Sequence, residues 1–249
     1  MPLTLPTHPV AVLPLKVWRP RWFDGVALTV GAVAPDLAYA VYGFAPVLRT
    51  HNLLAVLWWG VPVTLVVTGL VRWAAPVVAA HLPGGGRLRL GDYGVLGAVR
   101  HPWAVTVVSA AIGAFSHVAW DSVTHATFFP VLRREVWPGM PWWGLFSDAS
   151  NIAGFVAGAM IVVHLGRSGL IRRWHGPPPE VARRPVVFWA VVVAVLLAGL
   201  TTMLAFPVDW YTGTAIRALL IGGLALVGGA AAGRILKTVD SSVSIDQSR

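Results

Sequence analysis

Two histidines and an aspartate interrupt an apolar part of the chain in the stretch Ser116–His125, SHVAWDSVTH. His117, Asp121 and His125 are four residues apart. On a helix, four residues turn only about 40° beyond one revolution, so the three side chains project from one stripe. An imidazole and a carboxylate one turn apart can bind the same cation. Because the chain has no cysteine, this pattern predicts a divalent metal held by His and Asp. Zinc is the expected ion, with manganese or iron if more carboxylates join.

Other uses of these residues stay open. A single His or Asp near a helix end often caps the helix or bonds a neighbour, since a buried polar group needs only a hydrogen-bond partner. Within a membrane segment, however, an Asp costs about 2.5–3.5 kcal/mol on insertion scales, and such residues usually bind or conduct something. We therefore expect a metal or catalytic site, with a structural polar network or a transport pathway as alternatives.

The composition is that of an integral membrane protein. Of the 249 residues, 56% are hydrophobic and 12% charged, and the mean hydropathy is +0.70; soluble domains carry about 25% charged residues. The net charge of +9 does not indicate a nucleic-acid partner, because the arginines fall between apolar runs, as in membrane proteins. The expected partner is membrane lipid.

The apolar runs predict an all-α polytopic helix bundle with about six spanning segments, at about twenty residues per crossing. The segments are Gly25–Pro46, Leu53–Val71, Ala104–Trp120, Ile152–Leu165, Val186–Phe206 and Ala215–Gly233. The first is interrupted by Ala-Pro-Asp, so its crossing is expected to end near Pro35. Pro9–Val17 is too short to cross and is predicted as a half-helix packed against the next segment.

Four parts of the chain are distinguished by composition. They are a membrane domain (1–165), a basic proline-rich cytoplasmic loop (166–185), a two-helix membrane hairpin (186–236) and a disordered tail (237–249). Fifteen of the 19 Lys and Arg residues fall on one side of the predicted topology, and only Arg49, Arg133 and Arg134 on the other. By the positive-inside rule, we expect a multi-pass protein of the cell membrane with a cytoplasmic C-terminus.

This topology gathers the ionisable residues at the arginine-poor face. Asp36 ends the first crossing there, His51 opens the second, and the Ser116–His125 stretch closes the third. If Pro9–Val17 forms a hairpin with the following segment, His8 returns to the same face. The predicted site is therefore non-cytoplasmic.

Four motifs, THPVAVLPL, GAVAPDLAY, RTHNLLAV and GAFSHVAWDSVTHATFF, stand in this order between Met1 and Phe155. In them the chain resembles a family of uncharacterised bacterial integral-membrane proteins. That family is similar to the bacterial membrane-bound metal-dependent hydrolases and, more remotely, to zinc-dependent phospholipase C, an all-helical fold with a zinc cluster. The resemblance implies five metal ligands: His8, Asp36, His51, His117 and Asp121. His125 matches the DSxTH pattern of the closer family.

The chain also departs from the hydrolase pattern. The frequent PDxD motif reads PDLAY here, without its second carboxylate, and Asn52 replaces the serine of the THS motif. Fewer carboxylates favour one metal over three. Asp148, expected in a loop on the same side, could supply another ligand or a base.

The resemblance and the location together predict a metal-dependent hydrolase of a lipid-like or phosphoester substrate. Asp121 and Asp36 are the candidate catalytic carboxylates, either as ligands or as the group that takes a proton from water. A non-catalytic metal-binding scaffold would need the same ligands and stays open. A transporter is disfavoured, since Val186–Phe206 contains no ionisable residue. The sequence does not identify the substrate or the oligomeric state.

Overall fold

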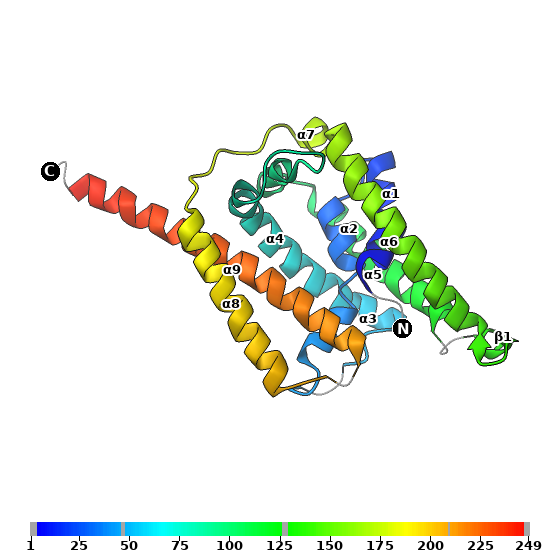
Figure 1. The fold of residues 1–249 in the computed structure, drawn as a ribbon. Helices are drawn as coiled ribbons and strands as arrows, with labels where there is room; N and C mark the ends of the chain where they lie inside the picture. The colour runs from blue at the N-terminus through cyan, green and yellow to red at the C-terminus, as the bar shows by residue number, and fades with distance from the viewer. Residues whose placement is uncertain (1–3, 46–47, 126–128, 209, 247–249) are drawn as a thin grey trace. The chain divides into compact units, whose positions relative to one another are not determined.

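The computed structural model describes residues 4–45, 48–125, 129–208 and 210–246, and it is almost wholly helical (Figure 1). This confirms the predicted all-α class. The elements are α1 (Thr4–Trp18), α2 (Gly25–Gly31), η1 (Asp36–Val41), α3 (Leu53–Ala55), η2 (Val56–Gly60), α4 (Val61–His81), η3 (Leu90–Gly97), α5 (Trp103–Thr124), η4 (Pro130–Arg133), β1 (Glu135–Trp137), β2 (Met140–Pro141), α6 (Trp142–Ser168), α7 (Leu170–His175), α8 (Pro185–Ala205) and α9 (Tyr211–Asp246). Among them η2 is a π-helix, and η1, η3 and η4 are 3₁₀ helices.

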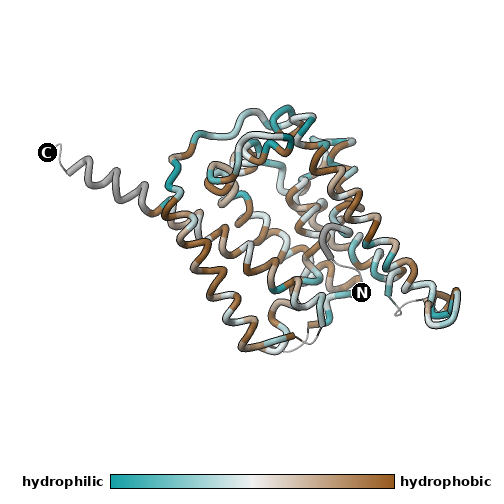
Figure 2. Tube along the Cα trace, viewed as in Figure 1, coloured by the Kyte–Doolittle hydropathy of each residue, from teal (hydrophilic) through white to brown (hydrophobic). Residues whose placement is uncertain are grey.

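Within the described residues, five helical stretches are long and apolar enough to cross a membrane. They are Leu53–His81, Trp103–Thr124, Trp142–Ser168, Pro185–Ala205 and Tyr211–Ile235. Hydrophobic residues predominate along them, most plainly along α8 (Figure 2). These helices indicate a multi-pass membrane protein.

The first predicted crossing is different in the structure. Over Gly25–Pro46, the described residues form the seven-residue α2, a series of turns and the short η1 instead of one spanning helix. Pro35 explains the break, because it has no N–H for a helical bond and disfavours the helical conformation of the residue before it. The interruption leaves Asp36 at the first position of η1.

The chain divides into two compact units. The first comprises Met1–Thr68, His101–Val162 and Val208–Ile216, and the second comprises Gly69–Arg100, Val163–Pro207 and Arg217–Arg249. All the predicted metal ligands belong to the first unit.

In the first unit, α1 and α2 form the predicted hairpin. Val12 of α1 packs on Leu28 and Ala32 at the far part of α2, while Lys16 lies against Gly25 at its start. The Lys16 ammonium is buried and donates hydrogen bonds to the carbonyls of Pro20 and Phe23 in the connecting turn, at 2.6 and 2.9 Å. Burial of this charge is thus balanced by hydrogen bonds that close the turn.

Helix α5 crosses α2 at very short distance. A Cβ atom on Gly31 would lie 2.6 Å from the Ala110 carbonyl oxygen, and one on Gly113 would lie 2.5 Å from that of Leu28. Only glycine permits this approach, which is typical of close helix packing in membranes. The contact brings the end of α2 against the part of α5 that carries His117.

In the second unit, α8 and α9 form an antiparallel pair (Figure 1). Gly199 of α8 lies against Ile221 of α9, and Phe188 and Val192 lie against Gly229. Phe188 is fully buried and forms the centre of an apolar cluster. The predicted tail 237–249 falls partly on α9 and, at 247–249, outside the described residues.

Candidate metal centre

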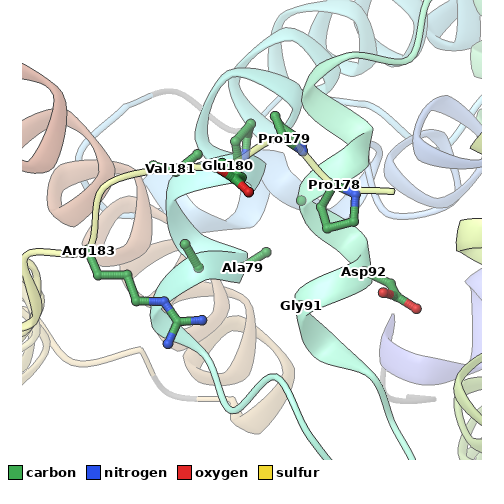
Figure 3. A pocket seen from close by; sticks show the side chains of 11 residues that line it. Ala79, Gly91, Asp92, Pro178, Pro179, Glu180, Val181 and Arg183 are labelled. Carbon is green, nitrogen blue, oxygen red and sulfur yellow. The ribbon is translucent and has the colours of Figure 1, made fainter. Parts of the chain in front are cut away.

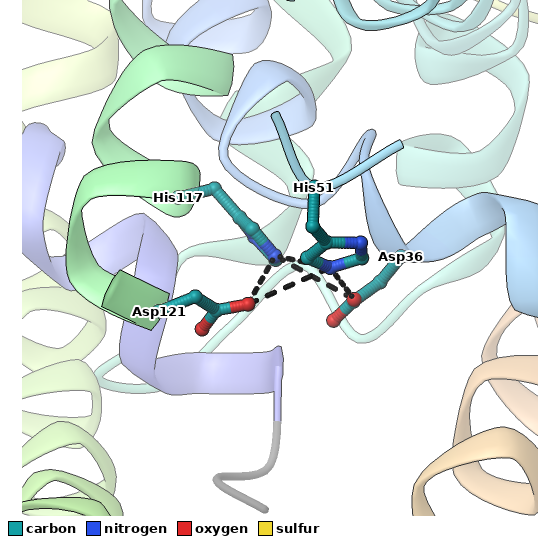
Figure 4. A group of neighbouring side chains, drawn as sticks. All are labelled: Asp36, His51, His117 and Asp121. Atoms are coloured by element: carbon teal, nitrogen blue, oxygen red, sulfur yellow. Dashed lines mark hydrogen bonds and ion pairs between the residues drawn. The ribbon is translucent and has the colours of Figure 1, made fainter. Parts of the chain in front are cut away.

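Four of the predicted ligands converge on one point in the first unit. Asp36, His51, His117 and Asp121 each offer one ligand atom, and these four atoms all lie within 4.8 Å of one another. Figure 4 shows the two carboxylates on either side of the two imidazoles. The residues come from three segments: η1, the chain just before α3, and the last two turns of α5.

The separations suit a common cation. From His51 Nε2 the distances are 2.9 Å to Asp36 Oδ1, 3.5 Å to Asp121 Oδ2 and 3.3 Å to His117 Nε2. From His117 Nε2 they are 3.5 Å to Asp36 Oδ1 and 3.3 Å to Asp121 Oδ2. A tetrahedron with zinc–ligand bonds of about 2.0–2.1 Å has edges of about 3.3–3.4 Å. Five of the six separations between the ligand atoms are thus 2.9–3.5 Å, close to the edges of such a tetrahedron.

His117 is oriented by the end of α2. Its side chain is fully buried, and Nδ1 donates a 2.8 Å hydrogen bond to the Ala32 carbonyl oxygen. In a neutral imidazole this bond keeps the proton on Nδ1, so that Nε2, which faces the cluster, is the nitrogen that can bind a metal. The close α2–α5 contact makes this bond possible.

His51 is oriented by its own neighbours. The Thr50 hydroxyl donates to the Pro35 carbonyl oxygen at 2.8 Å, and its oxygen lies 3.2 Å from His51 Nδ1. The Tyr39 hydroxyl lies 3.4 Å from the same nitrogen, and the Tyr39 ring stacks on the imidazole with centroids 5.4 Å apart. Both oxygens can accept from Nδ1–H, which again directs Nε2 toward the cluster.

Asp36 is nearly buried and stays ionised. Burial alone would raise the pKa of its carboxyl group. The charge and hydrogen bond of His117, with those of His51, outweigh burial and hold that pKa well below its usual value. Burial, followed by the negative charges of Asp36 and Asp121, raises the pKa of Tyr39. Tyr39 is therefore a neutral phenol beside a carboxylate that can bind a cation.

The outer oxygen of Asp121 faces two further imidazoles. Oδ1 lies 3.6 Å from His8 Nε2 and 3.5 Å from His125 Nδ1, and the His8 ring stacks on that of His117 with centroids 3.9 Å apart. Burial, with the charge of His117 next, lowers the pKa of His8 to about 3, so His8 is neutral. Asp121 Oδ1 is buried without a hydrogen-bond partner among the described residues. It is thus a free acceptor beside the cluster.

All six predicted ligands lie at this place, but two details differ from the prediction. His125 is the residue after α5 and has an extended backbone (φ −127°, ψ 155°), so the helical stripe ends at Thr124. Asp148 is an exposed residue of α6, not of a loop, and it is not one of the four grouped ligands.

Tyr39 and Thr50 are site residues that the sequence does not predict, although they stand in two of the four motifs. Tyr39 belongs to PDLAY and Thr50 to RTHN. The Tyr39 hydroxyl meets His51 Nδ1 twelve residues away, and the Thr50 hydroxyl meets the Pro35 carbonyl fifteen residues away, so neither contact leaves a periodic signal.

A pocket of about 430 Å³ lies in the second unit (Figure 3). Its lining residues are Pro76, Ala79, Ala80, Gly91, Asp92, Gly94, Pro178, Pro179, Glu180, Val181 and Arg183. It contains none of the predicted ligands, and nothing in its lining indicates a particular ligand.

Comparison with known proteins places the chain in a family but gives it no activity. No curated protein and no solved structure matches the chain, so the resemblance to hydrolases and to phospholipase C rests on the motifs alone. A family match extends over residues 1–237 and includes the last two membrane helices, beyond the reach of the motifs. By this match the chain belongs to the family described as Domain of unknown function (DUF4184).

Proposed function

We propose that this membrane protein binds one divalent metal ion, zinc by preference, through Asp36, His51, His117 and Asp121. The observation that carries the proposal is the convergence of four ligand atoms within 4.8 Å of one another. Two imidazoles with two carboxylates are a donor set for zinc, and also for manganese or iron. The contacts of His117 Nδ1 with the Ala32 carbonyl and of His51 Nδ1 with the Thr50 hydroxyl support this use, because they leave both Nε2 atoms facing the other ligands.

We further propose that the site hydrolyses a phosphoester or acyl ester of an amphiphile. A bound ion would act as a Lewis acid toward the ester and toward water. Asp121 would hold the ion through Oδ2 and accept a proton on Oδ1, which has no hydrogen-bond partner among the described residues. His8 and His125, at 3.6 and 3.5 Å from Oδ1, would stabilise the protonated carboxyl group.

The exposed edge of the cluster favours an amphiphilic substrate. His51 is the most accessible ligand, with 25% of its side chain exposed, whereas His117 is fully buried. Beyond Tyr39, which stacks on His51, the chain continues through the exposed apolar residues Val41, Tyr42 and Phe44. An ester held at His51 could therefore leave its hydrocarbon part beside apolar side chains.

A non-catalytic metal scaffold is the second candidate, and one observation favours it. Four protein ligands would fill a tetrahedral zinc shell, as in structural zinc sites, whereas catalytic sites keep one position open. In that case the ion would tie η1, the segment before α3 and α5 together. The two candidates share the metal and differ only in turnover.

The test is metal content followed by turnover. Purified protein is expected to hold about one equivalent of metal, and the double variant His117→Ala, Asp121→Ala close to none. His164→Ala, an exposed histidine of α6, is the matched control and should retain the ion. Equal, near-zero metal in wild type and double variant would refute the site. Metal-dependent cleavage of phosphoesters or acyl esters in micelles, absent from the double variant, would establish the hydrolase over the scaffold.

A further inference from the structure

Trp59 lies in the π-helical segment η2, outside the cluster, yet it bonds to the backbone that leads into Asp36. Its indole Nε1–H donates a 2.9 Å hydrogen bond to the carbonyl oxygen of Ala34, a fully buried residue. From this contact, and resting on the proposed metal site, we infer that Trp59 is a positioning residue for Asp36.

The link from Ala34 to Asp36 is short and stiff. Only Pro35 separates them, and its ring fixes φ near −65°. The Ala34 carbonyl also accepts the Leu37 amide at 3.2 Å, which starts the first turn of η1. A movement of the Ala34 peptide is therefore transmitted directly to the Asp36 carboxylate. The next carbonyl, of Pro35, is held by Thr50, so two side chains fix consecutive peptides before this ligand.

The π-turn places the indole where this bond can form. A π-helix holds one residue more per turn than an α-helix, which rotates the following side chains, and such turns are frequent at functional sites. Here Asn52 caps the helix start by accepting the Ala55 amide at 2.9 Å, and Val56–Gly60 follow as η2. Trp58 is exposed, whereas Trp59 is half-buried and reaches Ala34.

The same segment is fixed against the helix that carries the other ligands. Val56 packs with Ala114 and Val118 of α5, one on each side of His117 in sequence. A Cβ atom on Gly60 would lie only 2.7 Å from that of Ala114. Trp59 thus holds the backbone before Asp36 in place relative to the helix that bears His117 and Asp121.

The test uses Co²⁺, whose visible absorption depends on ligand geometry. Trp59→Phe keeps an aromatic ring and removes the N–H donor. We expect at least about a tenfold loss of Co²⁺ affinity, the lower end of the effect of changing residues that orient metal ligands, together with an altered absorption spectrum of the bound ion. Trp58→Phe, which changes the exposed neighbour, is the matched control and should keep both wild-type affinity and spectrum.

The thermal stability of metal-free wild type and Trp59→Phe shows whether the substitution affects folding or only the position of Asp36. If Trp59→Phe does not fold, benzothienylalanine at position 59 replaces the ring N–H by sulfur with nearly the same shape and serves as the second variant. A spectrum and an affinity equal to those of wild type in either variant would overturn the positioning role. Failure of wild type to bind Co²⁺ would instead overturn the proposed metal site and this inference with it.

Discussion

Thr50 lies at the junction of two ligand-bearing segments. Its hydroxyl hydrogen bonds to the Pro35 carbonyl oxygen just before Asp36, and its oxygen can accept from His51 Nδ1. Thr50 is itself almost completely buried, with 1% of its surface exposed. One hydroxyl thus contacts both the His51 ring and the backbone beside Asp36, although it offers nothing to a metal in this geometry.

Thr50→Val keeps the shape of the side chain and removes both hydrogen bonds. The buried Pro35 carbonyl then loses its side-chain donor, and His51 loses one acceptor. We expect zinc affinity, measured by competition with a chromophoric chelator, to fall about 10- to 100-fold. Thr29→Val removes a hydroxyl that, among the residues the structure describes, bonds within α2 to the Gly25 carbonyl, and it should leave the affinity unchanged. Equal affinities for the two variants would contradict a role for Thr50.

At the scale of single residues, the sequence predicts the candidate metal ligands better than the residues that orient them. His117 and Asp121 are identified by their helical spacing and by the cost of ionisable groups in an apolar run. Thr50, Tyr39 and Trp59 are common residue types, and their partners are backbone carbonyls or a ring nitrogen on other segments. Such partners become known only when the segments are placed in space.

At the scale of the elements, the candidate site depends on the crossing of α2 and α5. Gly31 and Gly113 let the two backbones approach so closely that His117 can bond to the Ala32 carbonyl oxygen. A larger side chain at the crossing would separate the helices and lengthen this bond. The packing of the two helices and the orientation of His117 therefore depend on the same contact.

Gly113→Ala tests that coupling. Its Cβ would lie 2.5 Å from the Leu28 carbonyl and 2.8 Å from the Ala32 amide nitrogen, and backbone atoms cannot yield without moving a helix. We expect a loss of roughly 1–3 kcal/mol in stability and a lower metal occupancy, measured by thermal unfolding and metal analysis. Gly69→Ala, in α4 with nothing within 4 Å of the new methyl group, should be neutral or slightly stabilising. Wild-type occupancy in Gly113→Ala would show that the crossing does not support the site.

A comparison of the predicted and observed helix boundaries shows which parts of the fold can be predicted from the sequence. Apolar runs predicted the helices around Leu53–Val71 and Val186–Phe206 well, because spanning length is a strong constraint. The segment predicted from the apolar run Ile152–Leu165 is shorter than the helix that contains it. Helix α6 begins at Trp142 and includes polar residues such as Asp148, which an apolar run does not capture. The Ala-Pro-Asp interruption predicted a break near Pro35, but the helix before it, α2, has only seven residues and is too short to cross.

At the scale of the whole molecule, the topology decides which side of the membrane holds Asp36, His51, His117 and Asp121. The distribution of Lys and Arg predicts the arginine-poor, non-cytoplasmic side. Within the first unit, Asp121 lies in the last turn of α5, and the β1–β2 hairpin follows it in the chain. The loop before α5 contains Arg87, Arg89 and Arg100 and is predicted to be cytoplasmic.

The chain has no cysteine, so single cysteines can report this topology without background. Glu135→Cys places a thiol on the exposed hairpin after α5, and Gly85→Cys places one in the exposed loop before it. A membrane-impermeant maleimide applied to spheroplasts should label position 135 before lysis and position 85 only after detergent is added. The reverse pattern would place the histidines and aspartates at the cytoplasmic face, where an external lipid leaflet could not supply the substrate. Labelling of both positions before lysis would mean that α5 does not separate the two loops, and the predicted crossing would then be wrong.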